Sequence, residues 1–179
     1  MRVLVVYESM FGNTHVVAEA VAAGFGPGDE TTVVPVGDAG PDLVYSSDLV
    51  IVGGPTHMHG MSRASTRKMA ADTAGKEGSP LHLEPQAAGA GLRDWFATLG
   101  RGRARAAAFD TRFEGPAAFT GRASKAITRQ LHRHGFEVVA EPESFLVDKQ
   151  NRLLDGEAER ARRWGAQLAD AVKEERAAL

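Results

Sequence analysis

Small polar side chains and a glycine lie in residues 7–18, where an apolar run gives way to a helical pattern. Ser9, Asn13 and Thr14 offer hydroxyl and amide groups to an anion, and Gly12 lets the backbone approach it closely. The helix start adds unpaired N–H groups and a positive dipole end. No Lys or Arg lies in the segment, which favours a phosphate held by neutral donors over a P-loop. A turn whose Ser and Thr only cap the helix is the structural alternative.

A second polar loop, residues 55–60, follows another apolar run. His57 and His59 would share one face if this segment were extended. Neither a third ligand nor an acid lies in the loop, so the pattern argues against a metal site. A loop that faces a ligand and a purely structural turn both remain possible.

The third polar loop follows a later apolar run and contains Asp110, Thr111, Arg112 and Phe113. Arg112 either faces a ligand or pairs at the surface with Asp110 or Glu114. Phe113 either covers a ligand or closes the core. No pair of side chains in the three loops forms an evident catalytic dyad, and we expect no catalytic residue.

Apolar runs alternate with helical patterns along the chain, which predicts an α/β fold with a doubly wound parallel sheet. The predicted strands are Arg2–Tyr7, Thr31–Val36, Asp48–Gly53, Arg105–Phe109 and a fifth, Phe136–Val139, that is interrupted at Glu141-Pro142 and resumes at Ser144–Val147. The predicted helices are Asn13–Phe25, Ser62–Ala74, Leu92–Leu99, Arg122–His134 and Asp155–Ala178.

The connection between the third and fourth strands is long, about residues 54–104. If both of its helices run down the sheet, the loop between them, residues 75–91, must climb back. We therefore hypothesise that part of this loop reaches the ligand end. A surface insertion at the opposite rim is the alternative.

The first segment resembles the FMN-phosphate signature of flavodoxins, and the element order resembles that family over nearly the whole chain. The signature positions are filled by Val6, Tyr7, Ser9, Gly12, Thr14 and Ala18. The resemblance implies one flavodoxin-like domain over residues 1–179, a five-stranded sheet of order 2-1-3-4-5 with an extended connection between strands 3 and 4, and FMN at the switch point.

In flavodoxins the two later loops flank the isoalloxazine ring, and a glycine such as Gly60 permits a peptide flip beside the ring's N5 edge. The residues that the resemblance assigns to FMN are Ser9, Met10, Phe11, Gly12, Asn13, Thr14, Pro55, Thr56, His57, Met58, His59, Gly60, Asp110, Thr111, Arg112 and Phe113. The family's usual Trp and Tyr are missing from both loops, so His57, Met58 and Phe113 are expected at the ring. Trp95 and Trp164 lie in helical patterns and are expected in the core.

The resemblance favours an FMN-dependent electron carrier that serves a redox partner protein. An FMN-dependent oxidoreductase with a small-molecule acceptor, of the quinone reductase or protoporphyrinogen oxidase type, is the first alternative; there His57, His59 and His82 would assist proton transfer. A module that has lost FMN and only binds proteins is the second.

Composition narrows the protein class further. The chain has no cysteine, which excludes a disulfide frame or thiolate chemistry, and no apolar run long enough to span a membrane. Residues 1–60 hold one Arg and seven acids, within a net charge of −2, which argues against nucleic acid as a partner. We expect a cytoplasmic protein without a membrane span.

Overall fold

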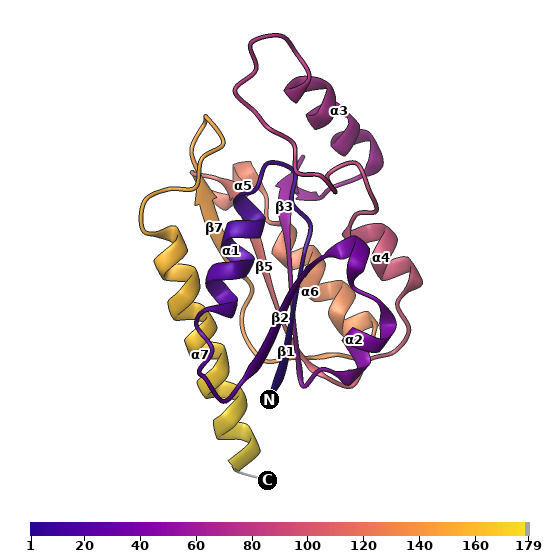
Figure 1. The fold of residues 1–179 in the computed structure, drawn as a ribbon, viewed down its shortest axis with the longest axis vertical. Helices are drawn as coiled ribbons and strands as arrows, with labels where there is room; N and C mark the ends of the chain where they lie inside the picture. The colour runs from indigo at the N-terminus through magenta and orange to yellow at the C-terminus, as the bar shows by residue number, and fades with distance from the viewer. Residues whose placement is uncertain (178–179) are drawn as a thin grey trace.

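A parallel sheet forms the middle layer of the computed structural model, which describes residues 1–177 (Figure 1). Its four long strands stand in the order β2-β1-β3-β5, so the predicted fold class and strand order are confirmed. These strands are β1 (Arg2–Tyr7), β2 (Glu30–Pro35), β3 (Leu49–His57) and β5 (Arg105–Phe113).

The fifth position of the sheet is divided between two short strands, β6 (Glu137–Val138) and β7 (Glu143–Val147). The first pairs with the start of β5 and the second with its end. The predicted interruption at Glu141-Pro142 is confirmed. Proline cannot donate a backbone hydrogen bond, which is consistent with a break in the pairing at this point.

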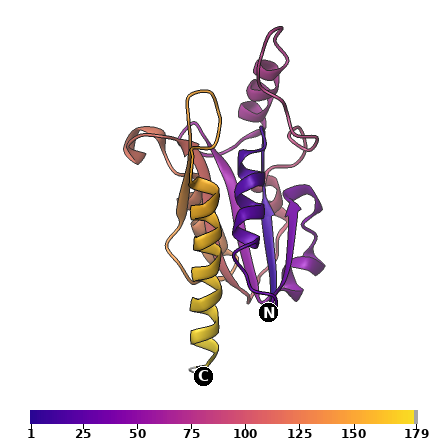
Figure 2. The same cartoon turned by 60° about the vertical axis from the view of Figure 1, so that its left-hand side comes forward.

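Helices cover both faces of the sheet (Figures 1 and 2). One face packs on α1 (Asn13–Ala22) and α7 (Glu157–Ala177), and its core includes Trp164. The other packs on α2 (Pro41–Ser46), α4 (Leu92–Thr98) and α6 (Ala123–Arg133), and its core includes Trp95. Both tryptophans are buried, as predicted. The short helices α2, η1 (Val36–Asp38) and α5 (Ala117–Thr120) were not predicted.

The second and third polar segments were predicted to be loops. In the structure they belong largely to strand ends. β3 continues to His57 because Gly54 and Pro55 pair with Asp110 and Thr111 of β5, and its last two residues pair with β4. The chain then reverses through Met58 and His59, whose φ angles are +47° and +71°, into β4 (Gly60–Met61). The left-handed conformation is costly for such side chains, so this hairpin is a strained part of the backbone.

The connection from β3 to β5 departs from its predicted path. α3 (Ala64–Ala74) stands beyond the carboxyl edge of the sheet rather than running down it (Figure 1). Of its residues only Arg67 is buried, so α3 has no apolar face with which to cover the sheet. Part of residues 75–91 does reach the expected end, because the Glu84 N–H donates to the Met10 carbonyl at 2.9 Å. The alternative of an insertion at the opposite rim is wrong.

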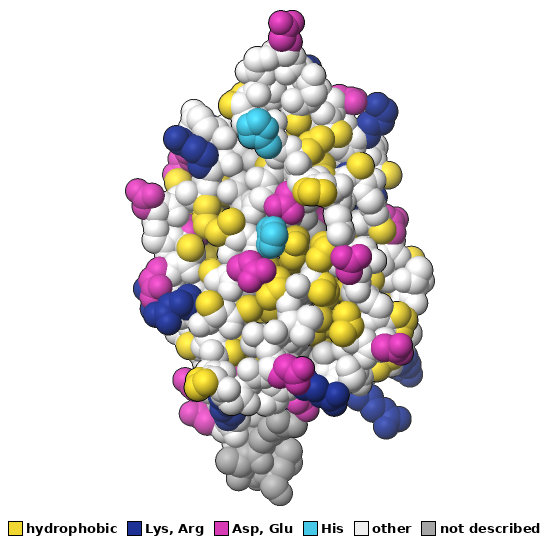
Figure 3. Space-filling model, in the orientation of Figure 1, with side chains coloured by type: hydrophobic (Ala, Val, Ile, Leu, Met, Phe, Trp, Pro, Cys, Tyr) yellow, Lys and Arg dark blue, Asp and Glu magenta, His cyan; other side chains and the backbone are white. Residues whose placement is uncertain are grey.

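Charges of both signs are interspersed on the face shown in Figure 3, and neither forms a continuous patch there. In residues 1–177 no helix combines the length and the apolar character that a bilayer crossing requires.

Two glycines let α1 and α7 approach closely. A Cβ built on Gly165 of α7 would lie 2.1 Å from the Val21 carbonyl oxygen, and one built on Gly24 would lie 2.1 Å from the Arg162 carbonyl oxygen. Both distances are far shorter than any real contact. The position of α7 on the sheet therefore depends on the missing side chains at these two residues.

Gly165→Ala should lower the free energy of unfolding by about 2 kcal/mol, because overpacking outweighs the better helix propensity of alanine. Gly28→Ala is the control, since its Cβ meets nothing within 4 Å, and it should change stability by less than about 0.5 kcal/mol. Urea unfolding measures both. Equal values for the two variants would contradict the close helix contact.

Candidate functional site

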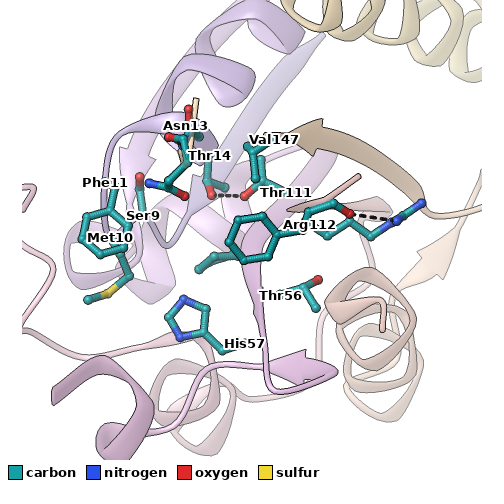
Figure 4. A pocket seen from close by; sticks show the side chains of 13 residues that line it. Ser9, Met10, Phe11, Asn13, Thr14, Thr56, His57, Thr111, Arg112 and Val147 are labelled. Atoms are coloured by element: carbon teal, nitrogen blue, oxygen red, sulfur yellow. Dashed lines mark hydrogen bonds between the residues drawn. The ribbon is translucent and has the colours of Figure 1, made fainter. Parts of the chain in front are cut away.

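A cleft opens at the carboxyl edge of the sheet, where the β1–α1 loop meets the ends of β3 and β5 (Figure 4). Its enclosed volume is about 120 Å³. The structure thus brings together all three segments singled out in the sequence. The lining residues are Ser9, Met10, Phe11, Asn13, Thr14, Pro55, Thr56, His57, Thr111, Arg112, Phe113, Val147 and Asn151.

The β1–α1 loop is shaped to expose the start of α1. Gly12 has a φ of +91°, a conformation that side chains rarely adopt, and its N–H donates to the Ser9 hydroxyl oxygen at 3.1 Å. No side-chain hydrogen bond caps α1 at Gly12, so the first N–H groups of the helix are available to a ligand. This geometry suits an anion, and the Ser9 hydroxyl also stabilises the turn by accepting the Gly12 N–H.

A pair of hydroxyl groups joins this loop to β5. The side-chain oxygens of Thr14 and Thr111 lie 2.7 Å apart, and both residues are buried (Figure 4). One hydroxyl must donate to the other, which leaves the proton of the accepting hydroxyl free for a ligand. The pair therefore both ties β1 to β5 and supplies a neutral donor.

Asn13 has a structural partner that the sequence did not indicate. Its amide nitrogen donates to the Asn151 carbonyl at 2.8 Å, and its amide oxygen accepts the Leu153 N–H at 3.1 Å. These bonds hold the loop after β7 against the start of α1, which places Val147 and Asn151 in the lining. Sequence reasoning missed both residues, because the contact spans more than 130 positions.

Two candidate residues cap α6. The Thr56 hydroxyl oxygen accepts the Ala123 N–H at 2.9 Å, and the Asp110 carboxylate accepts the Ser124 N–H at 2.7 Å. Asp110 is fully buried and does not line the cleft. Burial raises its pKa, and the bond from Ser124 only partly offsets this. Asp110 is therefore placed to stabilise the helix start rather than to contact a ligand.

Arg112 holds the turn that follows β5. Its Nη1 donates to the carbonyls of Phe113 and Gly115 and to the Thr120 hydroxyl, at 2.9–3.2 Å. Among the described residues it makes no ion pair with Asp110 or Glu114, the two partners considered from the sequence. Its Nε is buried without a partner in that same part of the chain.

His57 separates the cleft from a second one on the other side of the β3–β4 hairpin. It lines both clefts, whereas Met58, His59 and Gly60 line only the second. Burial is the main cause that lowers the pKa of His57; the Glu8 charge opposes it and the Arg67 charge adds to it. The imidazole is therefore neutral at pH 7.

A buried acid, Glu8, forms hydrogen bonds with residues that follow the hairpin. Its carboxylate accepts the Ser62 hydroxyl and, at 2.8 Å, the Leu92 N–H. Arg67 donates to the same Ser62 hydroxyl and to Asp94, at 3.3 and 2.9 Å. Sequence reasoning missed this network, although a charged residue directly after a buried strand was a possible signal.

No group of three or more His, Cys, Asp or Glu side chains within residues 1–177 is arranged to hold a metal ion.

The family model described as Flavodoxin matches residues 5–161. This chain belongs to the flavodoxin family. Comparison with curated proteins gives no match.

Solved structures show the same fold as this flavodoxin-family chain. An archaeal flavodoxin has 20% identity and a TM-score of 0.65, over 97% of this chain and 99% of that one. Oxidised flavodoxin 1 from Bacillus cereus has 18% identity and a TM-score of 0.63, over 95% and 98%. The rubredoxin oxygen:oxidoreductase of Desulfovibrio gigas has 20% identity and a TM-score of 0.58, over 97% of this chain and 36% of that one.

This member of the flavodoxin family has no Trp or Tyr in the lining of its cleft. Tyr7 is the nearest by sequence, but it stacks on His15 with ring centroids 4.5 Å apart, on the far side of Ser9. Aromatic and apolar contacts in the cleft come instead from Phe11, Phe113 and Met10.

Asp110→Asn should alter the pH dependence of stability. Because the pKa of Asp110 is raised, the folded state binds the proton more tightly than the unfolded state does. The contribution of Asp110 to stability therefore increases as the pH falls from the raised pKa toward the ordinary pKa of an aspartate. The unfolding free energy of the native protein minus that of the variant should therefore increase from about pH 7 to about pH 4.5.

Asp148→Asn is the control with the opposite sign, because hydrogen bonds from Arg152 lower the pKa of Asp148. Its corresponding difference should stay nearly constant over that range and decrease only as the pH falls below about 4, through the ordinary pKa of an aspartate. Equal slopes for the two variants in urea unfolding would show that Asp110 is not the buried group described above.

Proposed function

We propose that this protein binds FMN in the cleft and exchanges electrons with a redox partner protein. The observation that carries the proposal is the uncapped start of α1, presented by Gly12 beside the hydroxyls of Ser9 and Thr14. It lies between the carboxyl ends of β1 and its neighbours, at the switch point of the doubly wound sheet. Family membership supports the same ligand.

The phosphate of FMN would be held at the α1 end of the cleft. Backbone N–H groups of the first helical turn and the free hydroxyl proton of the Thr14–Thr111 pair would donate to its oxygens. No cation lines this end; Asn13 supports it by holding the loop after β7 in place. The residues present therefore fit a phosphate bound by neutral donors.

The ring of FMN would lie across the open mouth, because the enclosed volume of about 120 Å³ is well below the roughly 300 Å³ of the smallest ligand pockets. His57 borders the mouth on the hairpin side, and Phe113, half exposed, borders it on the β5 side. FMN would supply the one- and two-electron chemistry, and the protein orients the ring and limits water at its inner edge.

Exposed apolar side chains near the mouth favour a protein partner. Met58 and Phe119 are 79% and 76% exposed, and Phe113 is 50% exposed. Apolar groups at an exposed cofactor edge suit a transient docking surface.

A second candidate function is an FMN-dependent oxidoreductase with a small-molecule acceptor. The observation in its favour is the second cleft, of about 400 Å³, which shares His57 with the first and is also lined by His59. His82 lines neither cleft. Oxidation of NADPH or NADH with a quinone acceptor by the FMN-loaded protein would favour the enzyme, and its absence the carrier.

FMN titration tests the central proposal. FMN fluorescence should be quenched on binding, and Thr14→Val should weaken binding by about 1–3 kcal/mol because one donor to a charged acceptor is lost. Thr31→Val on the edge strand β2 is the control and should bind as the native protein does.

No binding by the native protein at about 100 μM FMN, a ΔG of only roughly −5.5 kcal/mol, would exclude FMN and favour a flavin-free interaction module. Unchanged affinity in folded Thr14→Val would remove Thr14 from the site.

A further inference from the structure

The second cleft is large enough for a small molecule. Its volume of about 400 Å³ lies within the roughly 300–1,000 Å³ range of ligand pockets. It is formed by the β3–β4 hairpin, the start of α3 and the start of α4, so the extended β3–β5 connection builds most of it. His57 lines both this cleft and the cleft proposed for FMN.

Methionine side chains form much of the apolar lining of this second cleft. Met58 and Met69 are 79% and 60% exposed, and Met61 in β4 is buried. Methionine side chains are flexible and polarisable, so they adapt to flat or irregular apolar ligands. Three of the five methionines of the chain line this cleft.

The charged side chains of the lining are positive. Arg63 and Arg93 line the cleft, and no acid among the described residues does so. Arg93 is held in place because its Nε donates to the Ser62 carbonyl at 2.9 Å and its Nη2 to the Met61 carbonyl at 3.3 Å. Within the described residues its Nη1 has no hydrogen-bond partner.

The two acids of the hydrogen-bond network behind the hairpin already accept hydrogen bonds from other groups. Glu8 accepts from Ser62 and Leu92, and Asp94 accepts from Arg67 and the Gly91 N–H. The two cleft arginines are therefore not neutralised by this network. A planar guanidinium beside apolar surface is suited to a carboxylate on an apolar body.

We propose that the second cleft binds a compact apolar carboxylic acid, with its carboxylate on Arg63 and Arg93 and its body against the three methionines. Binding does not require FMN. The proposal is therefore independent of the proposed function, although the two clefts share His57.

Methyl NMR of the protein labelled at its methionine methyl groups tests the proposal. Addition of 2-naphthoate should shift the signals of Met58, Met61 and Met69 and leave Met1 unchanged. The neutral 2-naphthamide should bind at least about tenfold more weakly, as expected when a charged hydrogen bond is lost. Met10 lies in the other cleft and reports FMN separately, so failure of one site is distinguishable from failure of the other.

Arg63→Gln and Arg93→Gln should each weaken naphthoate binding by about threefold or more, as expected for partly exposed charge pairs. Lys68→Gln is the control: Lys68 lies on the same helix, pairs with Asp72 at 3.0 Å and does not line the cleft. If Arg93→Gln disturbs the hairpin, naphthoate binding by Arg63→Gln and Met69→Ala still tests the proposal. Absence of shifts at millimolar naphthoate, equal binding of the amide, or no effect of Arg63→Gln would overturn the proposal.

Discussion

The parallel register of β1, β3 and β5 is the constraint on which the candidate site depends. Val5 pairs with Ile51 and Ile51 with Ala107, so the three strands run in the same direction toward one edge of the sheet, where β3 and β5 continue past the end of β1. Each chain reversal after these strands must then occur at one edge of the sheet. Because both faces are covered by helices, the ends of the strands are where a ligand can reach the backbone of the sheet.

Several polar side chains at this edge form hydrogen bonds within the fold and are not free to bind a ligand with the same atoms. Thr56 and Asp110 satisfy the first N–H groups of α6, and Asn13 holds the loop after β7. Buried N–H groups left unpaired would each cost about 1–3 kcal/mol, so the fold requires such partners. The groups that remain for an anion are mainly backbone N–H groups and the Thr14–Thr111 pair.

The buried carboxylate of Glu8 extends this organisation to the hairpin. It joins the end of β1 to Ser62 after the hairpin and to the start of α4. Arg67 comes from α3 and shares the Ser62 hydroxyl, which anchors the one buried position of a helix that otherwise stands in solvent. The strained turn at Met58 and His59 is thus followed directly by a satisfied polar network, and His57 before it lines both clefts.

The sequence by itself determined the α/β class, the strand order through its family signature, and the loop after β1 as the candidate anion site. Those features depend on local patterns: apolar runs, helical periodicity and the spacing of Ser9, Gly12 and Thr14. Only the tertiary structure decided the path of α3 and the extension of β3 and β5 through the predicted loops. It also decided which polar residues bond within the fold and which line the cleft. Whether Asp110 meets a ligand or a helix start depends on pairings between residues far apart in the chain, and no local pattern encodes these.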